Sequence, residues 1–347
     1  MRRRFGIWLG SFVWAFTASA LASPSYGAPG ALEVAQQRAM TVALQVPPLG
    51  FDVDESGFAR PVEKLGFRRR LVDGRTVRYV VPEAPRGLVY FFHGHGGSSA
   101  RVNSVEARAV LQSMYAEGFA IVAPDAQDQS TRLLDGERPP QDNADLARSL
   151  KIREDLIAAG IVSEETPVFA VGYSAGGRFA GYFGHAAAAA GVPVRAIAYH
   201  QARGRTTEFG HPPPVPSIWL PALHDNTVDP DRVSMEYAGH VARGGEGLLL
   251  WHRPGDLDAR RFTRDPDIGH DQSAAIASNA AVARLFDADG KAAVRAPGAG
   301  RRIRHATARL PEEVRSSART QLHAVLATHA FNGEHAAREA AFFVSAL

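Results

Sequence analysis

The sequence predicts an α/β protein with a mostly parallel sheet and helices on both of its faces. Two observations lead to this prediction: continuously apolar short segments such as 88–92 and 168–171, and longer segments of helical periodicity that alternate with them. Strands that are buried on both faces lack apolar–polar alternation, as expected for parallel strands between two layers of helices. Alternating strands and helices define the α/β class.

Each element follows from its local pattern. Asp73-Gly74 separates the extended segments 67–72 and 76–81 and is a typical hairpin turn. Between about residues 254 and 320, Arg, Asp, Pro and Gly become frequent, which indicates a small helical insertion before the last strand. Further strands are expected at 88–92, 119–123, 168–171, 194–198, 218–223, 248–251 and 322–327, and helices at 32–44, 101–117, 142–159, 176–190, 272–286, 311–321 and 334–347.

The N-terminus has the pattern of an export signal. Three arginines follow Met1, an apolar run covers 5–21, and Ala20-Leu21-Ala22 provides small residues at a cleavage site. We expect residues 1–22 to be removed, residues 23–60 to form a linker with a short helix, and 61–347 to form the functional domain. An uncleaved anchor is the alternative, although the run is short for a membrane span. The expected location is the periplasm or the exterior, by the general or the twin-arginine export route.

Charge and cysteine content exclude several classes of function. The three arginines of residues 1–22 account for the whole formal net charge of +3, so the remaining chain is neutral and gives no argument for a nucleic-acid partner. The absence of cysteine excludes disulfides, thiolate zinc sites, a cysteine nucleophile and a lipidated cysteine anchor. With 347 residues, the chain can still bury a large core.

The strongest functional pattern is Gly172-Tyr173-Ser174-Ala175-Gly176, between the strand at 168–171 and the helix at 176–190. A sharp turn from strand to helix presents a serine hydroxyl above the sheet edge, and glycines are needed because larger neighbours would clash. The pattern predicts Ser174 as a nucleophile. The alternative is a glycine-rich turn with a serine that has no catalytic role.

A second glycine-rich loop, His93-Gly94-His95-Gly96-Gly97, follows the strand at 88–92. An acyl-transfer site needs two backbone N–H groups as an oxyanion hole. We expect these at His95 and Ala175. The side chains of His93 and His95 have no third ligand nearby in the sequence, so we expect them to pack within the loop, and no metal site is predicted.

The nucleophile requires an acid and a histidine base later in the chain. Asp225 follows the strand at 218–223, at the strand end where ligand-facing residues lie in an open α/β sheet. Asp229 is the alternative acid. His329 follows the strand at 322–327 and precedes the last helix, so it is the expected base. His270 is the alternative base, although its surroundings are typical of a helix start.

Together, these motifs resemble the α/β-hydrolase superfamily, and within it the serine esterases related to dienelactone hydrolases and polyhydroxybutyrate depolymerases. The resemblance covers about residues 67–250 and 320–347. It implies that Asp225, in an acid loop of the D-x-x-V-x-P type, is the acid, and that His329, in an H-x-F segment, is the base. The chain departs from dienelactone hydrolases in having no cysteine nucleophile, and the insertion between acid and base is long.

The expected reaction is hydrolysis of a small or polymeric carboxylic ester through an acyl-enzyme, without a metal or organic cofactor. No nucleic-acid partner and no lasting membrane anchor are expected. Two alternatives use the same fold. One is a serine peptidase of the oligopeptidase type, and the other is a binding protein without catalytic activity.

Overall fold

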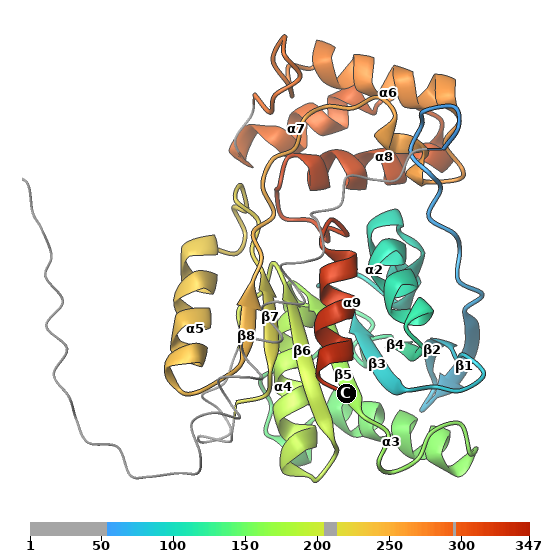
Figure 1. The fold of residues 1–347 in the computed structure, drawn as a ribbon, viewed down its shortest axis with the longest axis vertical. Helices are drawn as coiled ribbons and strands as arrows, with labels where there is room; N and C mark the ends of the chain where they lie inside the picture. Colours follow the sequence, from blue (N-terminus) through green and yellow to red (C-terminus); the bar gives the residue numbers. More distant parts are fainter. Residues whose placement is uncertain (1–53, 205–213, 294–295) are drawn as a thin grey trace, which may run out of the picture.

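The computed structural model describes residues 54–204, 214–293 and 296–347. The predicted export signal at 1–22 and the predicted helix at 32–44 lie outside these ranges. An eight-stranded sheet forms the centre of the molecule (Figure 1), with the strand order β1-β2-β4-β3-β5-β6-β7-β8. The strands are β1 (Arg68–Val72), β2 (Arg75–Val80), β3 (Gly87–Phe92), β4 (Phe119–Pro124), β5 (Val168–Tyr173), β6 (Val194–His200), β7 (Ser217–Leu220) and β8 (Gly247–Leu249).

The sheet is parallel from β4 to β8, whereas β1 pairs antiparallel with β2, and β2 antiparallel with β4. The predicted hairpin is confirmed, because Asp73 and Gly74 connect β1 to β2 with φ values of 49° and 73°. Two successive residues with positive φ form the turn that matches the twist of paired strands. This order and these directions are those of the α/β-hydrolase fold, so the predicted fold class is confirmed.

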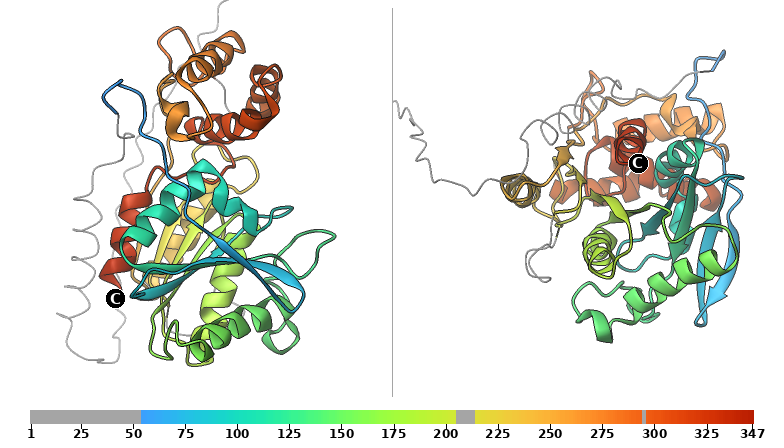
Figure 2. Two further views of the ribbon diagram at one scale, coloured as in Figure 1. Left: turned by 90° about the vertical axis from the view of Figure 1, so that its right-hand side faces the viewer. Right: turned by 60° about the horizontal axis from the view of Figure 1, so that its bottom comes forward.

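Helices cover both faces of the sheet (Figure 2) because alternate residues of each buried strand point to opposite sides. The helices are η1 (Ser99–Asn103), α2 (Val105–Ala116), η2 (Pro140–Asp142), α3 (Ala144–Ala158), α4 (Ala175–Ala189), α5 (Pro230–Ala242), η3 (Arg261–Arg264), α6 (His270–Val282), α7 (Ala296–Ala306), α8 (Glu312–Val325) and α9 (Ala336–Ser345). Tyr90 of β3 packs in one apolar cluster with α3, α4 and α5, and its neighbour Phe91 packs in the other cluster with α2 and α9. No helix in the described ranges is both long and apolar enough to cross a membrane.

The insertion forms a separate helical layer at one end of the sheet (Figure 1). It contains η3, α6, α7 and α8 and has its own apolar cluster, which includes Phe262, Ile276, Ile303 and Leu322. Its attachment to α2 is polar. The buried carboxylate of Glu106 lies 3.0 Å from Arg264 and 3.3 Å from Arg261, and Arg108 pairs with Asp265 at 2.9 Å.

The predicted strand at 322–327 is wrong, because these residues end α8 and continue into the turn after it. Val314, Ala318, Leu322 and Val325 recur at helical spacing and are buried in the cluster of the insertion. A short apolar run cannot be assigned to strand or helix from its own residues. The last strand is therefore β8, and the insertion follows the last strand instead of preceding it.

Candidate active site

Ser174 lies in the turn between β5 and α4, with φ 55° and ψ −121°. This conformation is rare for a residue with a side chain, and such strain is concentrated at functional sites. A Cβ on Gly172 would overlap the backbone of Gly176, and a Cβ on Gly176 would overlap the carbonyl oxygens of Phe92 and His93. The turn is therefore possible only with glycine at both positions.

The structure brings Ser174, His329 and Asp225 together in one chain of hydrogen bonds. Nε2 of His329 lies 2.9 Å from Oγ of Ser174, and Nδ1 lies 2.8 Å from Oδ2 of Asp225. The other carboxylate oxygen of Asp225 accepts hydrogen bonds from the backbone N–H groups of Thr227 (2.8 Å) and Val228 (2.9 Å). Both oxygens are thus fixed, which orients the imidazole toward the serine with Nδ1–H directed at the carboxylate.

Hydrogen bonds hold the loop that carries His329, between α8 and α9, against neighbouring loops, although no strand precedes it. The backbone N–H of His224 donates to the carbonyl of Ala327 at 2.8 Å, which joins the acid loop to the segment before His329. The Tyr173 hydroxyl donates to the carbonyl of His329 at 3.0 Å. Burial raises the pKa of Tyr173, so its hydroxyl keeps the proton that this bond requires.

The alternative residues lie elsewhere. Asp229 caps α5 by accepting a hydrogen bond from the N–H of Asp231 at 3.0 Å, and it is exposed. His270 begins α6, and its ring stacks on Phe58 with a centroid distance of 3.9 Å. In the part of the chain that the structure describes, neither residue bonds to Ser174, to His329 or to Asp225.

The glycine-rich loop after β3 lies against the serine turn. A Cβ on Gly94 would approach the Tyr173 ring to 2.8 Å, and the N–H of Gly97 donates to the carbonyl of Gly94 at 3.0 Å. His95 is therefore in the middle of a tight turn, where its side chain is exposed. Neither its N–H nor that of Ala175 bonds to another described residue, so both remain available to a ligand.

His93 has a structural position in this loop. Its side chain is buried, and Nδ1 hydrogen-bonds to the carbonyl of Gly94 at 2.8 Å. Burial lowers the pKa of His93, so the ring is neutral.

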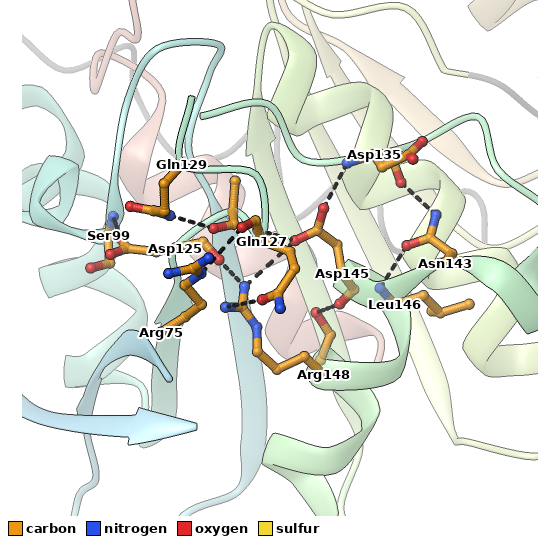
Figure 3. A network of polar contacts seen from close by, with 12 residues as sticks. Arg75, Ser99, Asp125, Gln127, Gln129, Asp135, Asn143, Asp145, Leu146 and Arg148 are labelled. Carbon is orange, nitrogen blue, oxygen red and sulfur yellow. Dashed lines mark hydrogen bonds and ion pairs between the residues drawn. The ribbon is translucent and has the colours of Figure 1, made fainter. Parts of the chain in front are cut away.

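A network of polar contacts anchors the chain where the glycine-rich loop 93–97 leads into η1 (Figure 3). Asp125, directly after β4, accepts a hydrogen bond from the N–H of Ser99 at 2.6 Å. Arg148 donates to the carbonyl of Asp125 and lies 3.5 Å from Asp145, whose carboxylate also accepts from the N–H of Gln127 at 2.7 Å. The start of η1 is therefore anchored to the sheet, which sets the position of the residues between β3 and η1.

A second Ser–His pair has the features of packing. Oγ of Ser217 lies 3.1 Å from Nε2 of His240, and both residues are buried. The same Oγ accepts a hydrogen bond from the Trp219 indole at 2.9 Å, and the same Nε2 lies 2.9 Å from the carbonyl of Glu246. Ser217 begins β7 in a regular strand, so it lacks the turn that presents Ser174 at the strand ends.

A cleft lies between α8 and the loops of the sheet, beside His329. One cavity of about 260 Å³ is lined by His329, His323, Arg101, Arg315 and Arg319, among others. A neighbouring cavity of about 400 Å³ shares Arg101 with it. The sequence analysis missed these arginines because nothing in the local pattern shows that η1 and α8 meet. Burial, together with the positive charges of Arg304, Arg101 and Arg319, lowers the pKa of His323 to about 4.

No protein-family model matches the chain, and no curated protein matches it in sequence. Similar solved structures include a thermostable esterase, at 18% identity and TM-score 0.42 over 55% of each chain. A Pyrobaculum calidifontis esterase gives 14% identity and TM-score 0.41, over 67% of this chain and 86% of that one. A dienelactone hydrolase from Anabaena variabilis gives 18% and 0.38, over 55% and 87%.

The chain spans about half the length of the thermostable esterase that it matches. Likenesses this distant identify neither a family nor a substrate. The functional proposal therefore rests on the side-chain geometry.

Proposed function

We propose that this protein is a serine hydrolase that cleaves carboxylic esters through an acyl-enzyme. The observation that carries the proposal is the hydrogen-bonded chain from Ser174 through His329 to Asp225, at 2.9 and 2.8 Å. A nucleophile bonded to a base, which is itself oriented by an acid, is the arrangement that activates a hydroxyl for acyl transfer.

In the first half of the proposed reaction, Oγ of Ser174 attacks the ester carbonyl carbon while Nε2 of His329 takes the serine proton. The carbonyl oxygen becomes an oxyanion, which the N–H groups of Ala175 and His95 stabilise. The C–O bond to the alcohol then breaks, and His329 gives its proton to the leaving oxygen. Asp225 stabilises the imidazolium that exists between these two proton transfers.

In the second half, water replaces the alcohol. His329 removes a proton from the water, whose oxygen attacks the acyl carbon, and the second tetrahedral intermediate collapses to release the carboxylic acid. The proton on His329 returns to Ser174. Every atom and proton is supplied by the ester, the water and these three side chains.

Labelling by a neutral alkyl fluorophosphonate tests the proposal. We expect one adduct per chain, located at Ser174 by peptide mass spectrometry, and no adduct in Ser174→Ala. Hydrolysis of p-nitrophenyl butyrate, compared with a peptide p-nitroanilide, tests whether esters are preferred. Faster peptide cleavage would move the proposal to a peptidase, and absence of both label and turnover would favour a binding protein.

We further propose that residues 1–22 direct export and are removed, which would place the mature protein in the periplasm or outside the cell. The support is the basic start, apolar centre and Ala20-Leu21-Ala22 ending of the sequence. N-terminal sequencing of the protein recovered from its native compartment should begin at Ser23. An intact Met1 in a membrane fraction would instead support an uncleaved anchor.

A further inference from the structure

A cluster of three polar side chains, two of them buried histidines, lies near the start of α9, outside the triad. One ligand atom from each of His252, Glu334 and His335 lies within 4.8 Å of the other two. His252 follows β8, whereas Glu334 and His335 immediately precede α9. Among the described residues, this is the one group of three or more metal-ligating side chains.

Three of the four ring nitrogens of His252 and His335 have no hydrogen-bond partner within the described chain. His252 is fully buried, and neither of its ring nitrogens has a hydrogen-bond partner within the described chain. His335 is 6% exposed, and its Nδ1 also lacks a partner. More than 90% of buried polar groups in proteins are satisfied, so each exception requires an explanation such as a bound ion.

The surroundings of the cluster suit a metal ion. Nε2 of His335 donates to the carbonyl of Trp251 at 3.2 Å, which leaves the lone pair of Nδ1 free. Histidines that bind metals usually donate their other ring N–H in this way. Nδ1 of His252 lies 3.7 Å from a carboxylate oxygen of Glu334, too far for a hydrogen bond but near the spacing of about 3.4 Å that zinc bond lengths give.

We propose that His252, Glu334 and His335 bind a divalent transition-metal ion of the zinc type. Two neutral imidazoles and a carboxylate are nitrogen and oxygen donors that suit zinc, and the Glu334 side chain, 34% exposed, leaves room for water as a fourth ligand. The ion would join the segment after β8 to the start of α9. Because the N–H of Leu223 donates to the carbonyl of His252 at 3.0 Å, the acid loop would be held by the same link.

The test uses the full chain, expressed without a histidine tag, treated with EDTA and then dialysed against Zn²⁺. We expect about one zinc per chain by mass spectrometry of metals, and an increase in Tm because zinc binds the folded state. Glu334→Gln and His335→Gln should lower the bound zinc at least fivefold and abolish the Tm increase. His305→Gln, at an exposed position on α7, is the matched control.

Circular dichroism shows whether each variant is folded, and Glu334→Gln keeps the shape of a side chain that is partly exposed. Substitution by Co²⁺ provides a second readout, since a tetrahedral site gives intense visible absorption. Absence of stoichiometric zinc in the wild type, or unchanged zinc content in folded Glu334→Gln, would overturn the proposal.

A separate observation concerns the substrate and rests on the proposed esterase function. The 260 Å³ cavity beside His329 is lined by three arginines and one carboxylate. Glu312 pairs with Arg315 at 2.8 Å. The side chain of Arg101 makes no hydrogen bond or ion pair with another described residue, and Arg319 donates only to the neutral Thr307 hydroxyl, at 2.8 Å.

Two guanidinium groups that have no carboxylate partner among the described residues therefore line the same cavity as His329, the proposed base. Arg101 comes from η1 and Arg319 from α8, so the sheet domain and the insertion each provide one. We infer that the acyl or alcohol part of the substrate carries an anionic group, such as a carboxylate, that these two arginines bind. Charge-assisted hydrogen bonds to a carboxylate are the strongest polar contacts such a cavity can offer.

The test compares mono-p-nitrophenyl adipate with p-nitrophenyl hexanoate, which have the same chain length and differ in the terminal carboxylate. The wild type should prefer the adipate in kcat/KM. Arg101→Gln and Arg319→Gln should each lower the adipate-to-hexanoate ratio about tenfold, and exposed Arg309→Gln should leave the ratio unchanged. If Ser174 is labelled and the ratio is the same in all variants, only the anionic substrate is excluded. If Ser174 is not labelled at all, the esterase proposal itself fails.

Discussion

The α/β domain and the helical insertion differ in how they are held together. In the α/β domain, two apolar clusters cover the faces of one sheet, and the strands β3 and β4 are buried along their whole length. The insertion has one smaller apolar cluster of its own. Its contact with α2 depends on charged pairs, in which Glu106 is fully buried between Arg261 and Arg264.

This difference assigns separate tasks to the two regions. The proposed acyl transfer requires atoms placed to a fraction of an ångström. Ser174 and Asp225 lie in loops that follow β5 and β7, and His329 lies in the segment between α8 and α9, which a backbone hydrogen bond from His224 to Ala327 ties to the Asp225 loop. The insertion provides α8, which forms one wall of the cleft and carries Arg315 and Arg319. We therefore expect substitutions in the sheet loops to change kcat, and substitutions at the attachment to change stability.

The largest effect is expected from Ser174→Ala, which removes the proposed nucleophile without disturbing the turn. We expect the kcat for p-nitrophenyl butyrate to fall by on the order of 10⁶, while the free energy of unfolding stays within about 1 kcal/mol of the wild type. Steady-state kinetics and urea unfolding measure the two quantities. His270→Ala in the insertion is the control, and an inactive His270→Ala would move the base into that region.

Substitutions at Asp225 and Asp229 form a matched pair that tests which residue is the proposed acid. Asp225→Asn should lower kcat by about 10⁴, because an amide can donate to Nδ1 and favour the wrong tautomer of His329. Asp229→Asn removes an exposed charge and keeps a side-chain oxygen that can cap α5, so its kcat should be unchanged. A larger loss in Asp229→Asn would show that the acid had been assigned to the wrong residue.

The attachment of the insertion is tested by Glu106→Gln. Removing this charge takes the carboxylate away from two buried arginines, and breaking a buried pair in this way costs about 3–5 kcal/mol. Urea unfolding at pH 7 should detect the loss, with exposed Glu313→Gln as the control.

The same variant gives a pH signature. Burial alone would raise the pKa of Glu106, but Arg264, Arg261 and the hydrogen bond from the Gly333 N–H together hold the pKa below its usual value. The charge therefore stabilises the fold above the unfolded pKa, and this stabilisation is lost as pH falls through the folded pKa. The difference between wild type and Glu106→Gln should shrink in acid, and a difference independent of pH would contradict the role of these charges.

The sheet could be predicted from sequence because fully buried strands are continuously apolar, and Ser174 because its turn needs glycines at fixed positions. The insertion could not be predicted in the same way. Residues 296–306 contain glycines and a proline near their start, yet they form α7. The apolar run at 322–327 belongs to a helical stripe whose other members lie one and two turns earlier in α8.

The sequence predicts His329 in a loop after a strand, whereas the helix α8 precedes it. Its place beside Ser174 depends on the backbone bond from His224 to Ala327, a contact between residues far apart in sequence. The same limit applies to Arg101 and Arg319, and to His252 and His335. Each pair is brought together by packing, and no local pattern marks either one.

The smallest effect is expected from Ser217→Ala, which separates packing from chemistry within the α/β domain. Ser217 bonds to both Trp219 and His240, so its loss leaves the buried indole N–H without an acceptor and should cost about 1–3 kcal/mol of stability. The kcat for p-nitrophenyl butyrate and the fluorophosphonate adduct at Ser174 should both be unchanged, because Ser217 begins a buried strand and is 1% exposed. Loss of turnover in a folded Ser217→Ala protein would make this second Ser–His pair the active one, and the sharply turned Ser174 would then need another explanation.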